Sequence, residues 1–137
     1  MKNNKSILVT GGTGSFGKKF IGTILKRHEE KNIIVYSRDE LKQYEMRENY
    51  PEGKFPIKYF IGDIRDLPRL TMAMADADIV IHAAALKQVP VAEYNPFETV
   101  KTNIMGGQNI IDAAMQMGVK KVIALSTDKA AAPVNLY

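Results

Sequence analysis

Residues 10–17 read Thr-Gly-Gly-Thr-Gly-Ser-Phe-Gly, and this stretch decides the fold of the chain. It stands between a β-branched apolar run, Ser6–Thr10, and a segment with helical apolar spacing, Ser15–Arg27. Gly11, Gly14 and Gly17 suit a tight turn whose bare backbone lets a pyrophosphate approach a helix N-terminus. We therefore predict a dinucleotide-binding loop, to which an ordinary glycine-rich turn is the alternative.

On either side of this loop, apolar runs alternate with segments of helical spacing. The runs predict strands at Ser6–Thr10, Ile33–Ser37, Ile57–Ile61, Ile79–His82 and Lys121–Ser126. The helical spacing predicts helices at Ser15–Arg27, Glu40–Glu48, Leu67–Ala75 and Phe97–Met117, the last with Val100, Ile104, Ile111 and Ala114 on one face. Such alternation indicates an α/β fold with a Rossmann-like, doubly wound parallel sheet.

We expect about five strands in the order 3-2-1-4-5, with a cofactor crevice at their carboxyl ends where strands one and four part. Because the strands are nearly unbroken apolar runs, we expect them to be buried on both faces. The sheet is incomplete by the standard of this fold. We therefore interpret residues 1–137 as one truncated nucleotide-binding domain.

Composition excludes several kinds of protein. The chain has 137 residues, 45% hydrophobic and 25% charged, and no cysteine, which excludes disulfides, thiolate catalysis and cysteine-based metal sites. No apolar run approaches the roughly 20 residues of a membrane span, and the N-terminus has no apolar segment typical of a signal peptide. We therefore expect a cytoplasmic protein, and we expect no bound metal. The net charge is +4, but the basic residues are scattered, so we expect no nucleic-acid partner.

The end of the second predicted strand bears on the choice of dinucleotide. NAD-binding loops place a carboxylate there to hold the ribose 2′-hydroxyl, whereas this chain has Ser37 and Arg38, with Lys42 one turn later. A guanidinium at this corner favours the 2′-phosphate of NADP. The alternative is a solvated arginine beside Asp39 and Glu40.

The ends of the third and fourth predicted strands carry further candidates. Asp63 can accept a hydrogen bond from the adenine amino group, or it can cap a helix or turn. Ala83 and Ala84 are small enough for a cofactor ribose to lie against the chain. We interpret His82 as a strand-end histidine with a satisfied hydrogen bond rather than as a catalytic base.

Four stretches together resemble a known family: residues 10–17, YSRDELKQ at 36–43, KQVPVAEYNP at 87–96 and STDKA at 126–130. They resemble the extended short-chain dehydrogenases/reductases of bacterial polysaccharide and surface-sugar synthesis. Within that family they resemble most the inverting UDP-N-acetylglucosamine 4,6-dehydratases. The resemblance covers essentially the whole chain and implies an N-terminal portion of such an enzyme.

The resemblance implies a set of residues that contact NADP. They are Gly11, Thr13, Gly14, Ser15, Phe16, Gly17, Ser37, Arg38, Asp39, Lys42, Gln43, Asp63, Ile64, Ala83, Ala84, Lys87, Thr127 and Tyr137. Lys87 would also contact the phosphate of the substrate, which is UDP-N-acetylglucosamine or a similar UDP-sugar; the alternative is a plain surface lysine.

The resemblance also implies a lyase mechanism in which the cofactor is recycled within one turnover. Tyr137 and Thr127 would act at the C4 hydroxyl of the sugar during its oxidation. Lys129 would then remove the C5 proton while Asp128 protonates the departing C6 hydroxyl. Each would need a perturbed pKa, raised for the aspartate and lowered for the lysine. The alternative for Asp128 and Lys129 is an exposed ion pair in a loop.

Tyr137 distinguishes branches of the family, because the membrane-anchored C5-retaining dehydratases carry methionine at that place. The lysine of the family's Y-x-x-x-K motif and the sugar-nucleotide subdomain would follow Tyr137, so we expect the 137-residue chain alone to be inactive. The intact enzyme is expected to be a homo-oligomer.

Two alternative functions remain. One is a sugar-nucleotide 4-epimerase or another extended dehydrogenase, and the other is a non-catalytic NADP-binding module. Asp128 and Lys129 argue against the epimerase, which removes no C5 proton and expels no C6 hydroxyl. The complete set of catalytic residue types argues against the non-catalytic module.

Overall fold

A computed structural model describes residues 5–27 and 31–127, and the predicted alternation of strands and helices is present in them. The strands are β1 (Ser6–Thr10), β2 (Asn32–Ser37), β3 (Ile57–Ile61), β4 (Ile79–His82) and β5 (Lys121–Ala124). They form one parallel sheet in the order β3-β2-β1-β4-β5. The predicted fold class and strand order are confirmed.

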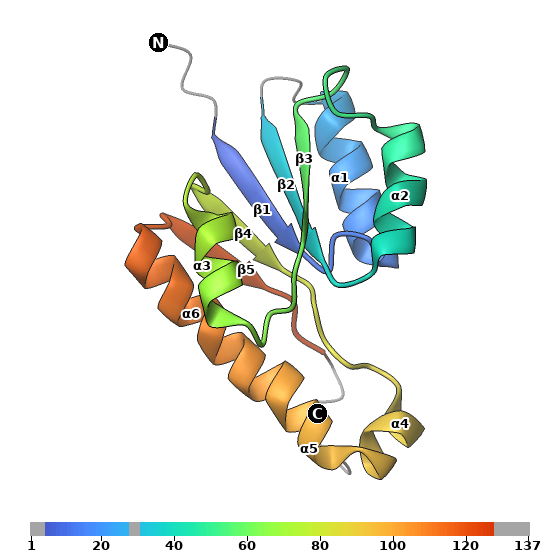
Figure 1. The fold of residues 1–137 in the computed structure, drawn as a ribbon, viewed down its shortest axis with the longest axis vertical. Coiled ribbons are helices and arrows are strands. Elements are labelled where there is room, and N and C mark those ends of the chain that lie inside the picture. The colour runs from blue at the N-terminus through green and yellow to red at the C-terminus, as the bar shows by residue number, and fades with distance from the viewer. Residues whose placement is uncertain (1–4, 28–30, 128–137) are drawn as a thin grey trace.

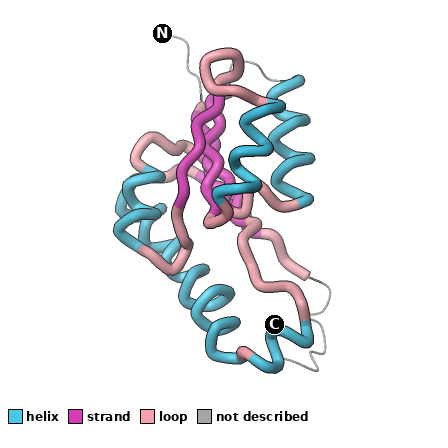
Figure 2. Tube along the Cα trace, turned by 45° about the vertical axis from the view of Figure 1, so that its right-hand side comes forward, coloured by secondary structure: helices cyan, strands magenta, loops and turns pink. Residues whose placement is uncertain are grey.

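Helices cover both faces of the sheet (Figure 1). On one face lie α1 (Ser15–Arg27) and α2 (Glu40–Asn49), which pack Ile21, Leu25 and Met46 into one apolar cluster. On the other face lie α3 (Leu67–Met74) and α6 (Gly106–Met117). The tube in Figure 2 shows the strands enclosed between these pairs of helices.

The two faces of the sheet explain the continuous apolar runs in β1 and β2. Ile7 and Val9 belong to the cluster under α1 and α2, whereas Leu8 belongs to the cluster under α3 and α6. Successive side chains of a strand point to opposite faces, so a strand covered on both sides must be apolar at every position. The expected burial on both faces is confirmed for these strands.

The same expectation is wrong for β5. Val122 and Ile123 are 40% and 47% exposed, and Leu125, just beyond the strand, is 42% exposed. The reason is its place at the edge of the sheet, where it pairs with β4 and with no other strand among the described residues. The apolar residues of β5 therefore predict a strand correctly, but they do not predict that the strand is exposed.

The predicted long helix at Phe97–Met117 is a composite. It consists of α5 (Pro96–Thr99), a π-helical segment η1 (Val100–Met105) and α6. Of the residues predicted to share one face, Ala114 is buried, but Ile104 and Ile111 are exposed. A π-helical turn holds more residues than an α-helical turn, so the residues of α6 are rotated about the helix axis relative to those before η1. A single α-helical period over the whole stretch therefore assigns the wrong residues to the buried face. The short helix α4 (Val89–Tyr94) was not predicted.

The connections leave the carboxyl edge of the sheet in two directions. After β1 the chain crosses to α1 on one face, and after β4 it runs past α4 and returns through α6 on the other face (Figure 1). A crevice therefore opens where β1 and β4 lie side by side. None of the helices in the described ranges has the length and apolar character needed to cross a membrane.

Candidate functional site

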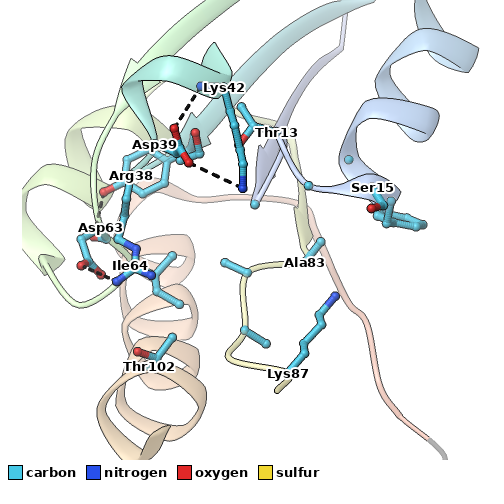
Figure 3. A pocket seen from close by; sticks show the side chains of 18 of the residues that line it. Thr13, Ser15, Arg38, Asp39, Lys42, Asp63, Ile64, Ala83, Lys87 and Thr102 are labelled. Carbon is cyan, nitrogen blue, oxygen red and sulfur yellow. Dashed lines mark hydrogen bonds and ion pairs between the residues drawn. The ribbon is translucent and has the colours of Figure 1, made fainter. Parts of the chain in front are cut away.

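A cavity of about 550 Å³ opens at the carboxyl edge of the sheet (Figure 3). Its lining includes most residues predicted to contact a dinucleotide: Gly11, Thr13, Gly14, Ser15, Phe16, Gly17, Ser37, Arg38, Asp39, Lys42, Asp63, Ile64, Ala83, Ala84 and Lys87. They come from the end of β2, from the loops after β1, β2, β3 and β4, and from the first turns of α1 and α2. The predicted place of the crevice, and of its glycines, is confirmed.

The loop after β1 forms a cradle that side chains would fill. Gly11 has a φ of +63°, and a Cβ added there would lie 2.9 Å from the backbone nitrogen of Ala84. A Cβ on Gly17 would lie 2.6 Å from Cα of Gly12. Only glycine accommodates both the left-handed backbone and these approaches. The glycines therefore let the loop pack closely on itself and on the turn after β4, while Gly11, Gly14 and Gly17 line the cavity without side chains.

The first turn of α1 supplies amide donors to this cradle. The amide of Lys18 donates to the carbonyl of Gly14 over 2.9 Å, which closes the first turn of the helix. The amides of Ser15, Phe16 and Gly17 come before that bond, in the part of a helix where N–H groups lack intrahelical acceptors. Because these residues line the cavity, the site suits a phosphate group.

Two cations border the corner of the cavity at the end of β2. Arg38 and Lys42 are both about half exposed, and their side chains extend toward the cavity in Figure 3. The nearby carboxylate of Asp39 accepts a hydrogen bond from the Lys42 amide at 3.0 Å and lies 3.5 Å from Nζ of Lys42. That amide bond caps α2 and is the main cause of the lowered pKa of Asp39. The Asp39 carboxylate is thus engaged by the first turn of α2 and by the Lys42 ammonium group.

Asp63 lines the cavity beside Arg38 and is held by arginines (Figure 3). Its carboxylate accepts bonds from the Arg65 backbone amide at 2.9 Å and from Nε at 3.0 Å, and it lies 3.6 Å from Nη1 of Arg38. Burial acts to raise the pKa of Asp63, but these hydrogen bonds and charges outweigh it, and the pKa lies below its ordinary value. The carboxylate is an ionised acceptor at the cavity wall.

His82 lies beneath the cavity and does not line it. Its ring bonds to the hydroxyl of Thr10, the last residue of β1. Burial lowers the pKa of His82, which favours a neutral imidazole. This is the satisfied strand-end histidine that the sequence predicts.

Other predicted site residues are not brought to the cavity by the described structure. Gln43 is only 2% exposed and lies in α2 behind the lining. Thr127 follows β5 and is not among the lining residues. The predicted catalytic residues Asp128, Lys129 and Tyr137 lie outside the described residues.

The structure adds residues that sequence reasoning missed. Thr102 of η1 is 5% exposed and reaches the cavity wall, and Gln88 also lines it. Asn103 accepts a bond from the amide of Leu86 at 2.9 Å and donates to its carbonyl at 3.1 Å, which fixes the loop leading to Lys87. Thr102 and Asn103 lie in a helical stretch that holds many other polar residues, so the sequence carried no signal that singled them out.

Residues 7–137 match the sequence family described as polysaccharide biosynthesis protein. The chain belongs to this family. It is 61% identical over 137 residues to a UDP-N-acetylglucosamine 4,6-dehydratase (inverting) of Campylobacter jejuni subsp. jejuni serotype O:23/36, and the match covers 100% of this chain and 40% of that relative. The predicted resemblance is confirmed.

Solved structures share the fold. The X-ray structure of Pen from Bacillus thuringiensis superposes with a TM-score of 0.91 and 43% identity, covering 98% of this chain and 40% of that one. A Thermus thermophilus UDP-glucose 4-epimerase complexed with NAD has a TM-score of 0.72 and 30% identity, covering 85% of this chain and 36% of that one. The chain thus spans about 40% of the length of the curated dehydratase that it matches.

Proposed function

We propose that this chain is the NADP-binding part of a cytoplasmic UDP-N-acetylglucosamine 4,6-dehydratase that inverts C5 in bacterial surface-sugar synthesis. The observation that carries the proposal is the cavity at the carboxyl edge of the sheet, where a bare glycine cradle faces a corner bordered by Arg38 and Lys42. The high identity to an inverting dehydratase over the whole chain supports the choice of reaction.

The residues present fit a dinucleotide with a 2′-phosphate. The cradle accommodates the pyrophosphate, and Arg38 and Lys42 supply positive charge at the corner where the adenine ribose would lie. Asp39 is engaged as a helix cap, so it competes poorly for a ribose 2′-hydroxyl. When bound, the nicotinamide supplies reversible hydride transfer, first from C4 and then to C6 of the sugar.

The chain's own residues would then move the protons. Tyr137 and Thr127 hold the C4 hydroxyl, and the tyrosine takes its proton. The resulting ketone acidifies C5–H, which Lys129 would remove, while Asp128 would donate a proton to the C6 hydroxyl so that water leaves. When the hydride returns to C6, a proton would be added to C5 on the opposite face, which completes the product and inverts C5. Thr127 follows β5, whose pairing with β4 aligns Ala124 with His82 at the carboxyl edge. The position of Thr127, three residues after Ala124, supports the proposal that this stretch acts near the carboxyl edge of the sheet.

We propose that the sugar nucleotide is held by a C-terminal subdomain, corresponding to the part of the relatives that this chain does not span. Lys87 would contact a phosphate of the UDP-sugar from the cavity side. The complete protein would act as a homo-oligomer, and residues 1–137 alone would not turn over substrate.

A sugar-nucleotide 4-epimerase is the second candidate, favoured by the match to the Thermus thermophilus epimerase. An epimerase acts only at C4, whereas Asp128 and Lys129 supply an acid and a base for C6 and C5. We therefore favour the dehydratase.

Product analysis separates the two. The complete gene product is incubated with UDP-N-acetylglucosamine, and the product is examined by mass spectrometry and NMR. A dehydratase gives a 6-deoxy-4-keto sugar that has lost one water, whereas an epimerase gives an isomer of unchanged mass. Tyr137→Phe serves as the control, because it removes the base that both reactions need.

A further inference from the structure

Gln43 is a buried amide that connects three structural elements. It belongs to α2, and its Nε2 donates to the Ser37 carbonyl at 3.2 Å, to Ser37 Oγ at 3.0 Å and to the Phe60 carbonyl at 2.8 Å. Ser37 ends β2 and Phe60 lies in β3. The reverse orientation of the amide would set its oxygen against two carbonyl oxygens, so the donor direction is fixed by its neighbours.

The two protons of Gln43 Nε2 are shared among three acceptors, and one of these acceptors is the Ser37 hydroxyl oxygen. Ser37 Oγ accepts the amide proton, so its own proton points to another acceptor. No protein acceptor for that proton is found in residues 5–27 and 31–127. Because Ser37 lines the cavity although it is only 8% exposed, a bound ligand is the natural acceptor.

The neighbours of Ser37 make this corner a set of donors. Arg38 and Lys42 are cations that cannot accept hydrogen bonds. Two carboxylates border the corner, and both are engaged: Asp39 by the Lys42 amide and ammonium, and Asp63 by Arg65 and by Arg38 at 3.6 Å. A phosphate monoester dianion has only acceptor oxygens and matches such a corner, whereas a ribose hydroxyl does not need so many donors.

We propose that Gln43 is a specificity-determining positioning residue that turns the Ser37 hydroxyl toward the 2′-phosphate of NADP. Gln43 itself touches no cofactor and acts through Ser37. The inference rests on the proposed function, and it replaces the direct cofactor contact that the family resemblance implies for Gln43.

Three variants of the complete protein, freed of cofactor, test this role. Gln43→Met keeps the length of the side chain and removes its donors, Ser37→Ala removes the hydroxyl, and the third variant combines both changes. Gln108→Met is the matched control, because this exposed glutamine of α6 bonds to Asp112 at 2.9 Å and lies away from the cavity lining. Titration calorimetry gives the Kd of each protein for NADP+ and for NAD+.

We expect each single variant to raise the Kd for NADP+ about 10-fold, the size of one charge-assisted hydrogen bond, and to change the Kd for NAD+ less than about twofold. In the Ser37→Ala background, Gln43→Met should have less than about a twofold further effect on NADP+, because its target is gone. Gln108→Met should leave both constants unchanged.

Equal weakening of both dinucleotides by Gln43→Met, or a full effect of Gln43→Met in the Ser37→Ala background, would show a merely structural role and overturn the inference. If Gln43→Met does not fold, unchanged NADP+ affinity in Ser37→Ala overturns it instead. A wild-type protein that binds NAD+ more tightly than NADP+ refutes the NADP proposal itself, and this result is distinct from any result with the variants.

Discussion

Oγ1 of Thr10 lies 2.8 Å from Nδ1 of His82, across the adjacent ends of β1 and β4. The same oxygen accepts hydrogen bonds from the amides of Ala83 at 3.2 Å and Ala84 at 3.4 Å. Because these amides use the oxygen as an acceptor, we assign the threonine O–H as the donor to a neutral His82. Thr10 and His82 together therefore hold in place the backbone of Ala83 and Ala84, which lies against Gly11 at the cavity.

Thr10→Val should disrupt this turn. Thr10 is fully buried, and valine has a similar shape but removes the hydroxyl partner of the Ala84 amide and of the His82 imidazole nitrogen. The Ala83 amide keeps its bond to the Thr10 carbonyl at 3.2 Å. We expect the free energy of unfolding, measured with urea, to fall by about 1–3 kcal/mol, together with weaker dinucleotide binding. Thr10→Ser keeps the hydroxyl and should retain most of both. A loss in Thr10→Ser with none in Thr10→Val would assign the effect to packing of the methyl group and contradict the role of the hydroxyl.

The buried His82 should make stability depend on pH. Burial lowers the pKa of His82 from its ordinary value of 6.5, so below about pH 6.5 the unfolded chain binds a proton that the folded chain does not. The free energy of unfolding should therefore fall as the pH drops from about 7 toward 5.5, and His82→Gln should remove part of this slope. His28→Gln is the control, since His28 is the other histidine of the chain. An unchanged slope in His82→Gln would contradict the assignment.

Gly11→Ala should abolish tight dinucleotide binding. Gly11 has a φ of +63° and a Cβ there would meet the backbone of Ala83 and Ala84. Gly53→Ala is the matched control, because Gly53 has a φ of +88° with no atom within 4 Å of an added Cβ. We expect the control to lose about 1 kcal/mol of stability and keep its affinity, whereas Gly11→Ala loses more stability and at least about 10-fold in affinity. Equal losses of stability and of affinity in the two variants would mean that backbone strain alone causes them, and that the close approach of Gly11 to Ala83 and Ala84 does not contribute.

Arg38→Ala should lower the affinity for NADP+ by about 1–3 kcal/mol and hardly change that for NAD+, because a charge-assisted contact to the 2′-phosphate is lost. Calorimetric titration with both dinucleotides measures the difference. Arg47→Ala is the control, since Arg47 lies on α2, is half exposed and pairs with Glu52 at 3.5 Å. Similar losses for NADP+ and NAD+ would show that Arg38 does not recognise the 2′-phosphate.

Local sequence signals were sufficient for the sheet and for most of the cavity. The glycine spacing at residues 10–17 predicts its own turn, and the apolar runs predict strands whose carboxyl ends must share one edge. Residues within two positions of a strand's end, such as Arg38, Asp63 and Ala83, are therefore predicted at the cavity from the sequence alone, and the structure has them in its lining.

Other features depend on partners that are distant in the sequence. Gln43 reads as a polar helix residue next to Lys42, and its burial arises because Ser37 and Phe60 meet beneath it. Thr102 reaches the cavity wall from the π-helical segment, whose extra residue per turn leaves no regular period in the sequence. The exposure of β5 depends on what pairs with its outer edge, which its apolar residues do not specify.

The most direct test of the dehydratase proposal is stopped-flow absorbance of reduced nicotinamide in the complete protein carrying Asp128→Asn. The amide keeps the shape of the side chain but is too weak an acid to protonate the C6 hydroxyl. Oxidation at C4 should survive while loss of water slows about 100-fold or more, so reduced cofactor should accumulate with UDP-N-acetylglucosamine and decay slowly. Normal dehydration without such a burst would contradict the role of Asp128, and release of a 4-epimer by the wild-type protein would contradict the dehydratase itself.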